Sequence, residues 1–231
     1  MRFKSLFNLK EHFGELLKGE FLERENRFTA KVLVDGRKAR AHVADTGRLR
    51  ELLKKGAPLI LAHNPKGKLD YKLVSVKKGR EWVLLNTQVH SKIAERAIRE
   101  GLLGFKPKEV KREVKVGNSR IDFLVDGELF IEVKGCNLVE FRKCLFPDAP
   151  TKRGRKHLQE LITLKKKGYS CGILFLAFRN CSCFTPNEKR DSLFAKTFKD
   201  ALREGVKFFG IKLSFNPETG EILLNSKLKL C

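Results

Sequence analysis

The segment that most constrains the fold is residues 122–134, which reads DFLVDGELFIEVK. Two apolar runs flank an Asp-Gly pair, a strong short-range signal for a β-hairpin. A two-residue loop would place Asp122 opposite Ile131, on the other face from Glu132. A three-residue loop or a bulge, with Gly127 left-handed in a type I turn, shifts the register by one residue. The hydrophobic pattern favours this shift, because it gathers on one buried face Ile121, Phe123, Val125, Leu129, Ile131 and Val133.

The shifted register places Asp122, Glu132 and Lys134 together on the opposite face. Two carboxylates and a lysine are the groups that metal-assisted cleavage of a phosphodiester requires. The carboxylates would hold Mg²⁺ with few protein ligands, and the lysine would steady the attacked phosphate. The motif alone is equally consistent with an ordinary amphipathic hairpin whose charges face water.

The charge balance indicates an anionic partner. The chain carries 49 lysines and arginines against 27 aspartates and glutamates, a net charge of +22 over 231 residues. This surplus favours nucleic acid over an anionic membrane surface. A thermophilic origin would explain abundant charge of both signs, but not the surplus. Since no 18-residue apolar run and no signal-like start occurs, we expect a cytoplasmic protein without a membrane contact.

The six cysteines form no zinc pattern, because no two of them have the two-residue gap of a zinc-binding pair. Cys181 and Cys183 are too close in sequence for an ordinary disulfide with each other. For a cytosolic protein we expect reduced, mostly buried thiols. A thermophilic cytosol would permit a disulfide, so one bridge stays open.

Residues 1–86 are predicted to form a small nucleic-acid-binding barrel. Turn signals such as Asp35-Gly36 and Lys78-Gly79 separate six candidate strands. The strands are expected at residues 19–25, 28–34, 37–44, 59–62, 71–77 and 81–85. A short helix at 47–54 falls between the third and fourth strands. This order resembles a Greek-key barrel of the OB type.

Residues 87–231 are predicted to form an α/β domain around a central mixed sheet, so the whole chain is α+β. Helices are expected at about residues 88–103, 151–167 and 189–205, and they alternate with strands. The unbroken apolar run at 173–178 is typical of a strand covered on both faces.

Two helices of this domain carry further candidate residues. Glu95, at the edge of an apolar stripe, could lean over the sheet as an additional metal ligand, although a solvent-facing glutamate is the more common case. On the next helix, Arg153, Lys156, His157 and Glu160 have the spacing of one polar face. The cations could grip phosphate, and His157 could position a phosphate or relay a proton. The alternative is a solvated basic face.

Four stretches together resemble the sugar fermentation stimulation protein A family. They are residues 45–53 (DTGRLRELL), 119–123 (SRIDF), 131–134 (IEVK) and 146–161 (FPDAPTKRGRKHLQEL). The resemblance implies an OB-type barrel, a PD-(D/E)xK nuclease-like domain, non-specific DNA binding and a regulatory role in sugar metabolism. It implies a metal site of Glu95, Asp122 and Glu132, with Asp122, Glu132 and Lys134 catalytic. The predicted nucleic-acid contacts are Arg48, Arg120, Arg153, Lys156 and His157.

Two hypotheses of different class follow. In the first, the chain is a Mg²⁺- or Mn²⁺-dependent endonuclease or exonuclease acting on duplex or single-stranded DNA. In the second, it is a non-catalytic DNA-binding regulator of sugar metabolism genes that retains the nuclease fold. A complete acid set favours the first, because a binding platform gains nothing from carboxylates that face phosphates. The oligomeric state stays open, with a homodimer among the possibilities.

Overall fold

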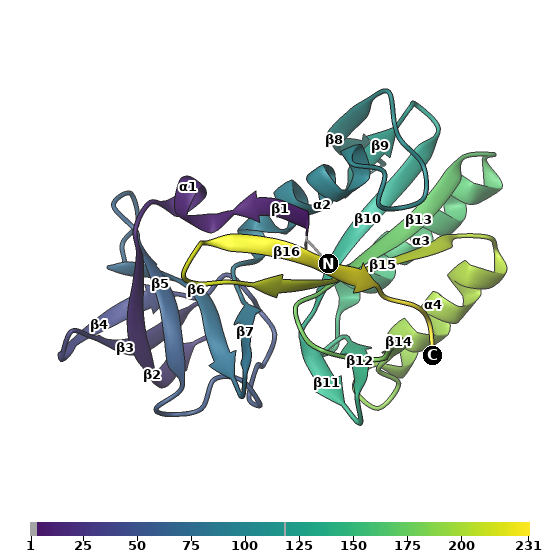
Figure 1. Ribbon diagram of the computed structural model, residues 1–231. Coiled ribbons are helices and arrows are strands. Elements are labelled where there is room, and N and C mark those ends of the chain that lie inside the picture. Colours follow the sequence, from purple (N-terminus) through teal and green to yellow (C-terminus); the bar gives the residue numbers. More distant parts are fainter. Residues whose placement is uncertain (1–3, 118) are drawn as a thin grey trace. The chain divides into compact units, whose positions relative to one another are not determined.

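The computed structural model describes residues 4–117 and 119–231, which divide into two compact units (Figure 1). The first unit contains the residues up to Val89 and two later segments, Phe178–Asn180 and Leu213–Asn225. The second contains His90–Ala177, Cys181–Lys212 and Ser226–Cys231. Among the described residues, no helix is long and apolar enough to cross a membrane.

The first unit is built on a closed five-stranded barrel. Its strands are β2 (Leu16–Asn26), β3 (Thr29–Val34), β4 (Arg37–His42), β5 (Pro58–His63) and β6 (Tyr71–Lys78). Antiparallel neighbours run in the order β4-β3-β2-β5-β6, and a parallel pairing between β4 and β6 closes the ring. Every second side chain of a strand faces the same side of the sheet, and on β3 the buried residues Ala30, Val32 and Val34 fill the interior of the barrel. The predicted OB-type barrel is therefore confirmed.

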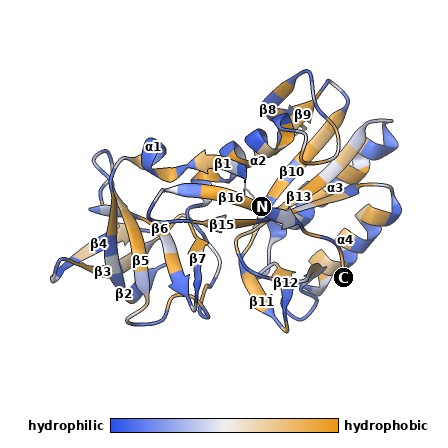
Figure 2. Cartoon of the chain, in the orientation of Figure 1, coloured by the Kyte–Doolittle hydropathy of each residue, from blue (hydrophilic) through white to orange (hydrophobic). Residues whose placement is uncertain are grey.

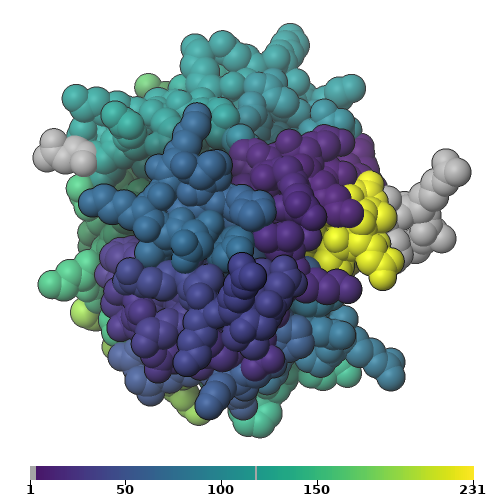
Figure 3. Space-filling view, turned by 90° about the vertical axis from the view of Figure 1, so that its left-hand side faces the viewer, coloured from purple at the N-terminus to yellow at the C-terminus, as the bar shows by residue number. Residues whose placement is uncertain are grey.

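The first unit has further elements besides the five barrel strands. Strand β7 (Glu81–Leu84) extends the sheet beside β6, and the short helix η1 (Thr87–Val89) follows it. Strand β1 (Lys4–Asn8) leads into α1 (Leu9–Phe13) and pairs antiparallel with β16 (Glu221–Lys227). Figure 3 shows the barrel residues, coloured purple to blue, as a continuous surface.

The predicted helix at residues 47–54 is wrong. This segment is a loop with one turn, in which the amides of Leu52 and Leu53 donate to the carbonyl of Leu49. Leu49 has a φ of 51°, which a continuing α-helix does not allow. The guanidinium of Arg24 also donates to the carbonyls of Asp45, Gly47 and Arg48, so those carbonyls do not start a helical ladder.

The second unit has the predicted mixed sheet at its centre. Its strands are β8 (Val110–Val116), β9 (Ser119–Val125), β10 (Leu129–Cys136), β13 (Ser170–Ala177) and β15 (Lys207–Phe215). They are ordered β15-β13-β10-β9-β8, with β10, β13 and β15 mutually parallel and β8, β9 and β10 antiparallel. The helices are α2 (His90–Arg99), α3 (Lys152–Lys166) and α4 (Ser192–Arg203).

Helices cover both faces of this sheet, which is why polar groups on β10 are buried. Leu158 of α3 and Phe194 of α4 belong to one apolar cluster with Phe130 and Phe175 of the sheet. On the other face, a side chain at Gly135 would collide with the ring of His90 on α2. Strand β13 is accordingly buried along nearly its whole length, as its apolar run predicted. Figure 2 shows how hydrophobic and hydrophilic residues are distributed over these elements.

The expectation of reduced thiols is wrong for four of the six cysteines. Disulfides join Cys144 to Cys181 and Cys183 to Cys231, with Cα–Cα distances of 5.7 and 5.0 Å. A small sheet surrounds the first disulfide, in which β12 (Lys143–Phe146) lies parallel to β14 (Cys183–Pro186) and antiparallel to β11 (Leu138–Glu140). The second disulfide lies beside a bridge between Phe184 and Leu230. Cys136 and Cys171 are free and buried.

Candidate functional site

The β9–β10 hairpin has the shifted register that the hydrophobic pattern predicted. Val125 pairs with Leu129, so the loop contains the three residues 126–128. The amide of Glu128 donates to the carbonyl of Val125 at 3.0 Å. Gly127 is left-handed as predicted, with a φ of 74°, but Asp126 also has a positive φ of 49°. The turn therefore has the primed sense favoured in hairpins rather than the expected type I conformation.

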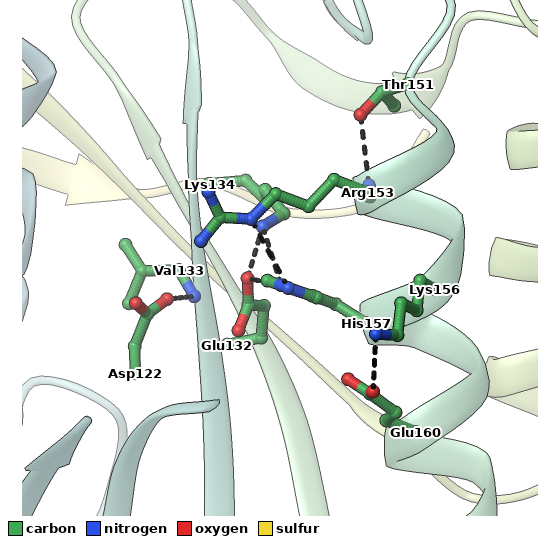
Figure 4. Close-up of polar contacts among 10 residues, drawn as sticks. Asp122, Glu132, Val133, Lys134, Thr151, Arg153, Lys156, His157 and Glu160 are labelled. Carbon is green, nitrogen blue, oxygen red and sulfur yellow. Dashed lines mark hydrogen bonds and ion pairs between the residues drawn. The ribbon is translucent and has the colours of Figure 1, made fainter. Parts of the chain in front are cut away.

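Glu132 is the buried centre of the site, with only 2% of its surface exposed. Lys134 Nζ and His157 Nδ1 both donate to its Oε1 (Figure 4). Burial pushes the pKa of Glu132 up, but Lys134 and His157 outweigh that effect and hold the pKa below its usual value. Its second oxygen, Oε2, is buried and has no hydrogen-bond partner among the described residues. The site thus contains a charged carboxylate with one unsatisfied oxygen.

Asp122 lies across from Glu132 when the hairpin register is continued by one pair. Its Oδ2 accepts a hydrogen bond of 2.6 Å from the amide of Val133. Burial, followed by the nearby charge of Glu132, raises the pKa of Asp122 from 3.8 to about 6. The two carboxylates therefore repel each other in a dry environment, an arrangement that a cation between them would relieve.

His157 faces the sheet and is 4% exposed. Arg153 Nε donates to His157 Nε2 at 3.5 Å, so Nε2 is the acceptor nitrogen of the ring. The ring proton is then on Nδ1, which donates it to Glu132. Lys134 Nζ lies 3.5 Å from the same Nδ1. Of the predicted polar stripe, Lys156 remains exposed, with its Nζ 3.9 Å from Glu160 Oε1. His157 is consequently placed to orient Glu132, and Arg153 reaches over the same site (Figure 4).

A cavity of about 760 Å³ lies next to the site and meets it at His157, whereas Asp122, Glu132 and Lys134 do not line it. His157 lines one side of it, and Arg120 contributes from β9. Five cationic side chains surround the cavity: Lys115, Arg120, Lys152, Arg153 and Lys156. Such a cationic hollow is suited to the phosphates of a polyanion.

Glu113 also lines the cavity and was missed by the sequence reasoning. The neighbouring pairs, Arg112 with Phe123 and Val114 with Ile121, put Glu113 opposite Asp122. Its charge adds to the rise in the pKa of Asp122. No spacing rule points to it, because Glu113 is one of several charged residues along β8 and its φ of 51° breaks the strand geometry.

The structure does not gather every predicted residue at this point. Both carboxylate oxygens of Glu95 contact arginines: Arg99 Nη2 lies 2.9 Å from Oε1, and Arg112 Nε lies 3.6 Å from Oε2. Arg48 is exposed in a loop of the first unit. Within residues 4–117 and 119–231, no group of three or more His, Cys, Asp or Glu side chains is arranged to hold a metal ion.

A divalent cation nevertheless fits the residues present. Mg²⁺ is commonly held by one or two carboxylates, with water and substrate phosphate completing its shell. Asp122 and Glu132 would be those carboxylates. The unsatisfied Glu132 Oε2 and the raised pKa of Asp122 are the features that such a cation would relieve.

Comparisons with known proteins agree on one family across the chain. Residues 22–85 match the SfsA N-terminal OB domain, and residues 88–219 match the sugar fermentation stimulation protein RE domain. The homolog from Thermosipho melanesiensis is 40% identical over 214 residues, which cover 92% of this chain and 93% of that protein. The homolog from Sulfolobus acidocaldarius is 44% identical over 186 residues, or 80% and 77% of the two chains. SfsA from Pyrococcus furiosus, solved in complex with Ca²⁺, superposes with a TM-score of 0.90 at 31% identity and covers 99% of both chains.

Proposed function

The chain belongs to the sugar fermentation stimulation protein family, and we propose that it binds DNA largely without sequence specificity and hydrolyses phosphodiesters. The residues proposed to carry out the hydrolysis are Asp122, Glu132 and Lys134. The observation that carries the proposal is the carboxylate pair on one hairpin beside a cavity with five cationic side chains. Carboxylates in such a position gain a role only if a cation accompanies the phosphate.

Asp122 and Glu132 would hold Mg²⁺ or Mn²⁺. The Ca²⁺ bound by the similar Pyrococcus furiosus protein supports a divalent cation at this fold. When bound, the cation would favour deprotonation of water and neutralise charge that develops on the phosphate.

The remaining groups of the chain bind and orient. Lys115, Arg120, Lys152, Arg153 and Lys156 contact backbone phosphates, which fixes the position of the DNA without reading its sequence. Lys134, held beside Glu132, donates to the attacked phosphate. His157 keeps Glu132 oriented through its Nδ1 hydrogen bond.

A non-catalytic DNA-binding regulator of sugar metabolism genes is the second candidate. The specific observation in its favour is the state of Glu95, whose carboxylate is already bound by Arg99 and Arg112. The acid set at the cavity then lacks the ligand expected from the first helix. In this case the five cations would bind DNA, and the carboxylates would remain as a structural cluster.

A titration of Mg²⁺ and Mn²⁺ on labelled single-stranded and duplex DNA separates the two candidates. The variants are Glu132→Gln and Lys134→Met, with Glu128→Gln on the exposed loop of the same hairpin as the matched control. Metal-dependent cleavage by wild type and the control, with a loss of at least about 100-fold in both site variants, supports the enzyme. Metal-independent binding without cleavage by all four proteins supports the regulator.

A further inference from the structure

We propose that Phe141, at the tip of the β11–β12 hairpin, is a stacking platform for an unpaired nucleobase. This inference rests on the proposed DNA binding and specifies the form of DNA that the second unit recognises. Base stacking on an aromatic ring is tolerant of sequence, because every base presents a π-face.

Among the large apolar side chains of residues 4–117 and 119–231, that of Phe141 is the most exposed to solvent. It is 92% exposed, whereas Leu193 is 59% exposed and Phe28 is 49% exposed. The Phe28 ring also has the guanidinium of its neighbour Arg27 over it, 5.7 Å from the ring centroid. Phe141 therefore presents a ring to solvent that folding does not use.

The backbone at this tip is as unusual as the exposure. Phe141 and Arg142 have φ values of 48° and 62°, the left-handed conformation that two-residue hairpins require of their central residues. Asn and Gly adopt it readily, whereas a bulky side chain adopts it at a cost. Costly backbone conformations that persist are concentrated at functional sites.

The hairpin holds the ring on a rigid base. Glu140 pairs with Lys143 across the turn, and the amide of Ser182 donates to the carbonyl of Arg142 at 2.7 Å. Cys144, which follows Lys143, is joined by a disulfide to Cys181. A platform that is already ordered loses little conformational entropy when it binds.

The surroundings of the ring suit a nucleic acid. Arg142 and Lys143, which follow Phe141, are exposed cations that can contact the phosphates on either side of a stacked base. In the sequence the hairpin follows β10, which carries Lys134, and precedes α3, which carries Arg153, all within the second unit. The hairpin itself therefore offers an aromatic ring for a base and two cations for the adjoining phosphates.

The bases of a regular duplex are already stacked on one another, so the platform is useful only where a base is unpaired. We therefore expect the second unit to prefer single-stranded DNA, or duplex with a frayed end or gap, over an uninterrupted duplex.

Fluorescence anisotropy with a labelled single strand and a closed hairpin duplex of the same length tests this in the full chain. Phe141→Ala should weaken single-strand binding at least about five-fold and change duplex binding less. Phe141→Trp should retain affinity and Phe141→Leu should not, because leucine is apolar but has no π-face. Leu193→Ala is the matched control. In a Trp82→Phe background, the single strand should quench the indole fluorescence of the Phe141→Trp variant.

Equal affinities of wild type and Phe141→Ala for the single strand would overturn the platform while leaving DNA binding intact. Rescue by leucine as complete as by tryptophan would also overturn it, in favour of a merely apolar contact. If wild type bound neither DNA, the proposed function itself would fail. Since Phe141 is exposed, circular dichroism should show unchanged folding in all variants.

Discussion

The two hairpins of the second unit make similar turns with very different residues. Asp126, Gly127 and Glu128 join β9 to β10, whereas Phe141 and Arg142 join β11 to β12. The φ angle is positive at Asp126 and Gly127 of the first loop and at both residues of the second. Asp-Gly suits this conformation, and the Asp126 carboxylate also accepts from the amides of Lys108 and Glu109 at 2.8 and 2.7 Å. Phe-Arg does not suit it. The residues of the first turn favour its backbone conformation, whereas the second turn keeps an unfavourable conformation and exposes the Phe141 ring.

The unfavourable energy of the first hairpin lies in its side chains. Asp122 and Glu132 are carboxylates in a site covered by helices, where Lys134 and His157 compensate Glu132 and the amide of Val133 donates to Asp122. One hairpin thus stores electrostatic strain within the protein, and the other stores backbone strain at the surface. Substitutions can relieve either strain, and the resulting changes in the free energy of unfolding should differ in size.

The largest effect is expected from Lys134→Met, which leaves Glu132 buried with one fewer cation. The free energy of unfolding should fall by about 3 to 5 kcal/mol at pH 7.5 in EDTA, measured by urea denaturation. The control Lys156→Met removes an exposed lysine with a weak contact to Glu160, and it should change the free energy of unfolding by less than about 0.5 kcal/mol. Adding Glu132→Gln to Lys134→Met should recover most of the loss. A loss under about 1 kcal/mol would contradict the buried pair.

Asp122→Asn should have the next largest effect, and in the stabilising direction. Folding raises the pKa of Asp122 from 3.8 to about 6, so the folded state binds this proton more tightly and loses stability as pH rises between these values. Asparagine removes that loss and can still accept from Val133. The variant should gain about 2 to 3 kcal/mol above pH 6 in EDTA and nothing below about pH 4. A gain independent of pH would exclude titration of Asp122 as the cause.

Periodicity predicted the parts of the fold that burial controls. Alternating apolar residues located the barrel strands. The same argument chose the three-residue loop, because a slip of one residue would move Ile121 and Phe123 to the face of the charged residues. Capping signals predicted a helix at 47–54 that does not form, because Arg24 of a distant strand binds the carbonyls of Gly47 and Arg48. A long-range hydrogen bond of this kind has no signal in the local sequence.

The site was harder to predict than the sheet that carries it. Spacing on β10 joined Glu132 to Lys134, but the direction of His157 depends on which face of α3 packs on the sheet. Glu113 reaches the cavity through a cross-strand pairing, and the Cys144–Cys181 disulfide depends on the parallel alignment of β12 with β14. Likewise, no composition change marks Leu213–Asn225 as part of the first unit.

Gly127→Val should destabilise the first hairpin moderately. A β-branched residue at a φ of 74° is strained, and the free energy of unfolding should fall by about 1 to 2 kcal/mol. Gly127→Asn, which tolerates this conformation, should lose clearly less in the same urea titration. Equal losses for valine and asparagine would mean that side-chain volume, rather than backbone conformation, controls this turn.

The smallest effect should come from the second hairpin, with the opposite sign. Replacing Phe141 by Asn and Arg142 by Gly together gives the residues that a primed turn prefers, so unfolding should cost about 1 kcal/mol more. Phe141→Ala alone keeps a left-handed non-glycine residue and should gain little, which separates backbone strain from the exposed ring. If the double variant is more stable yet binds single-stranded DNA more weakly, the strain is maintained for recognition. If its stability is unchanged, the two turns are equivalent and the contrast between them is lost.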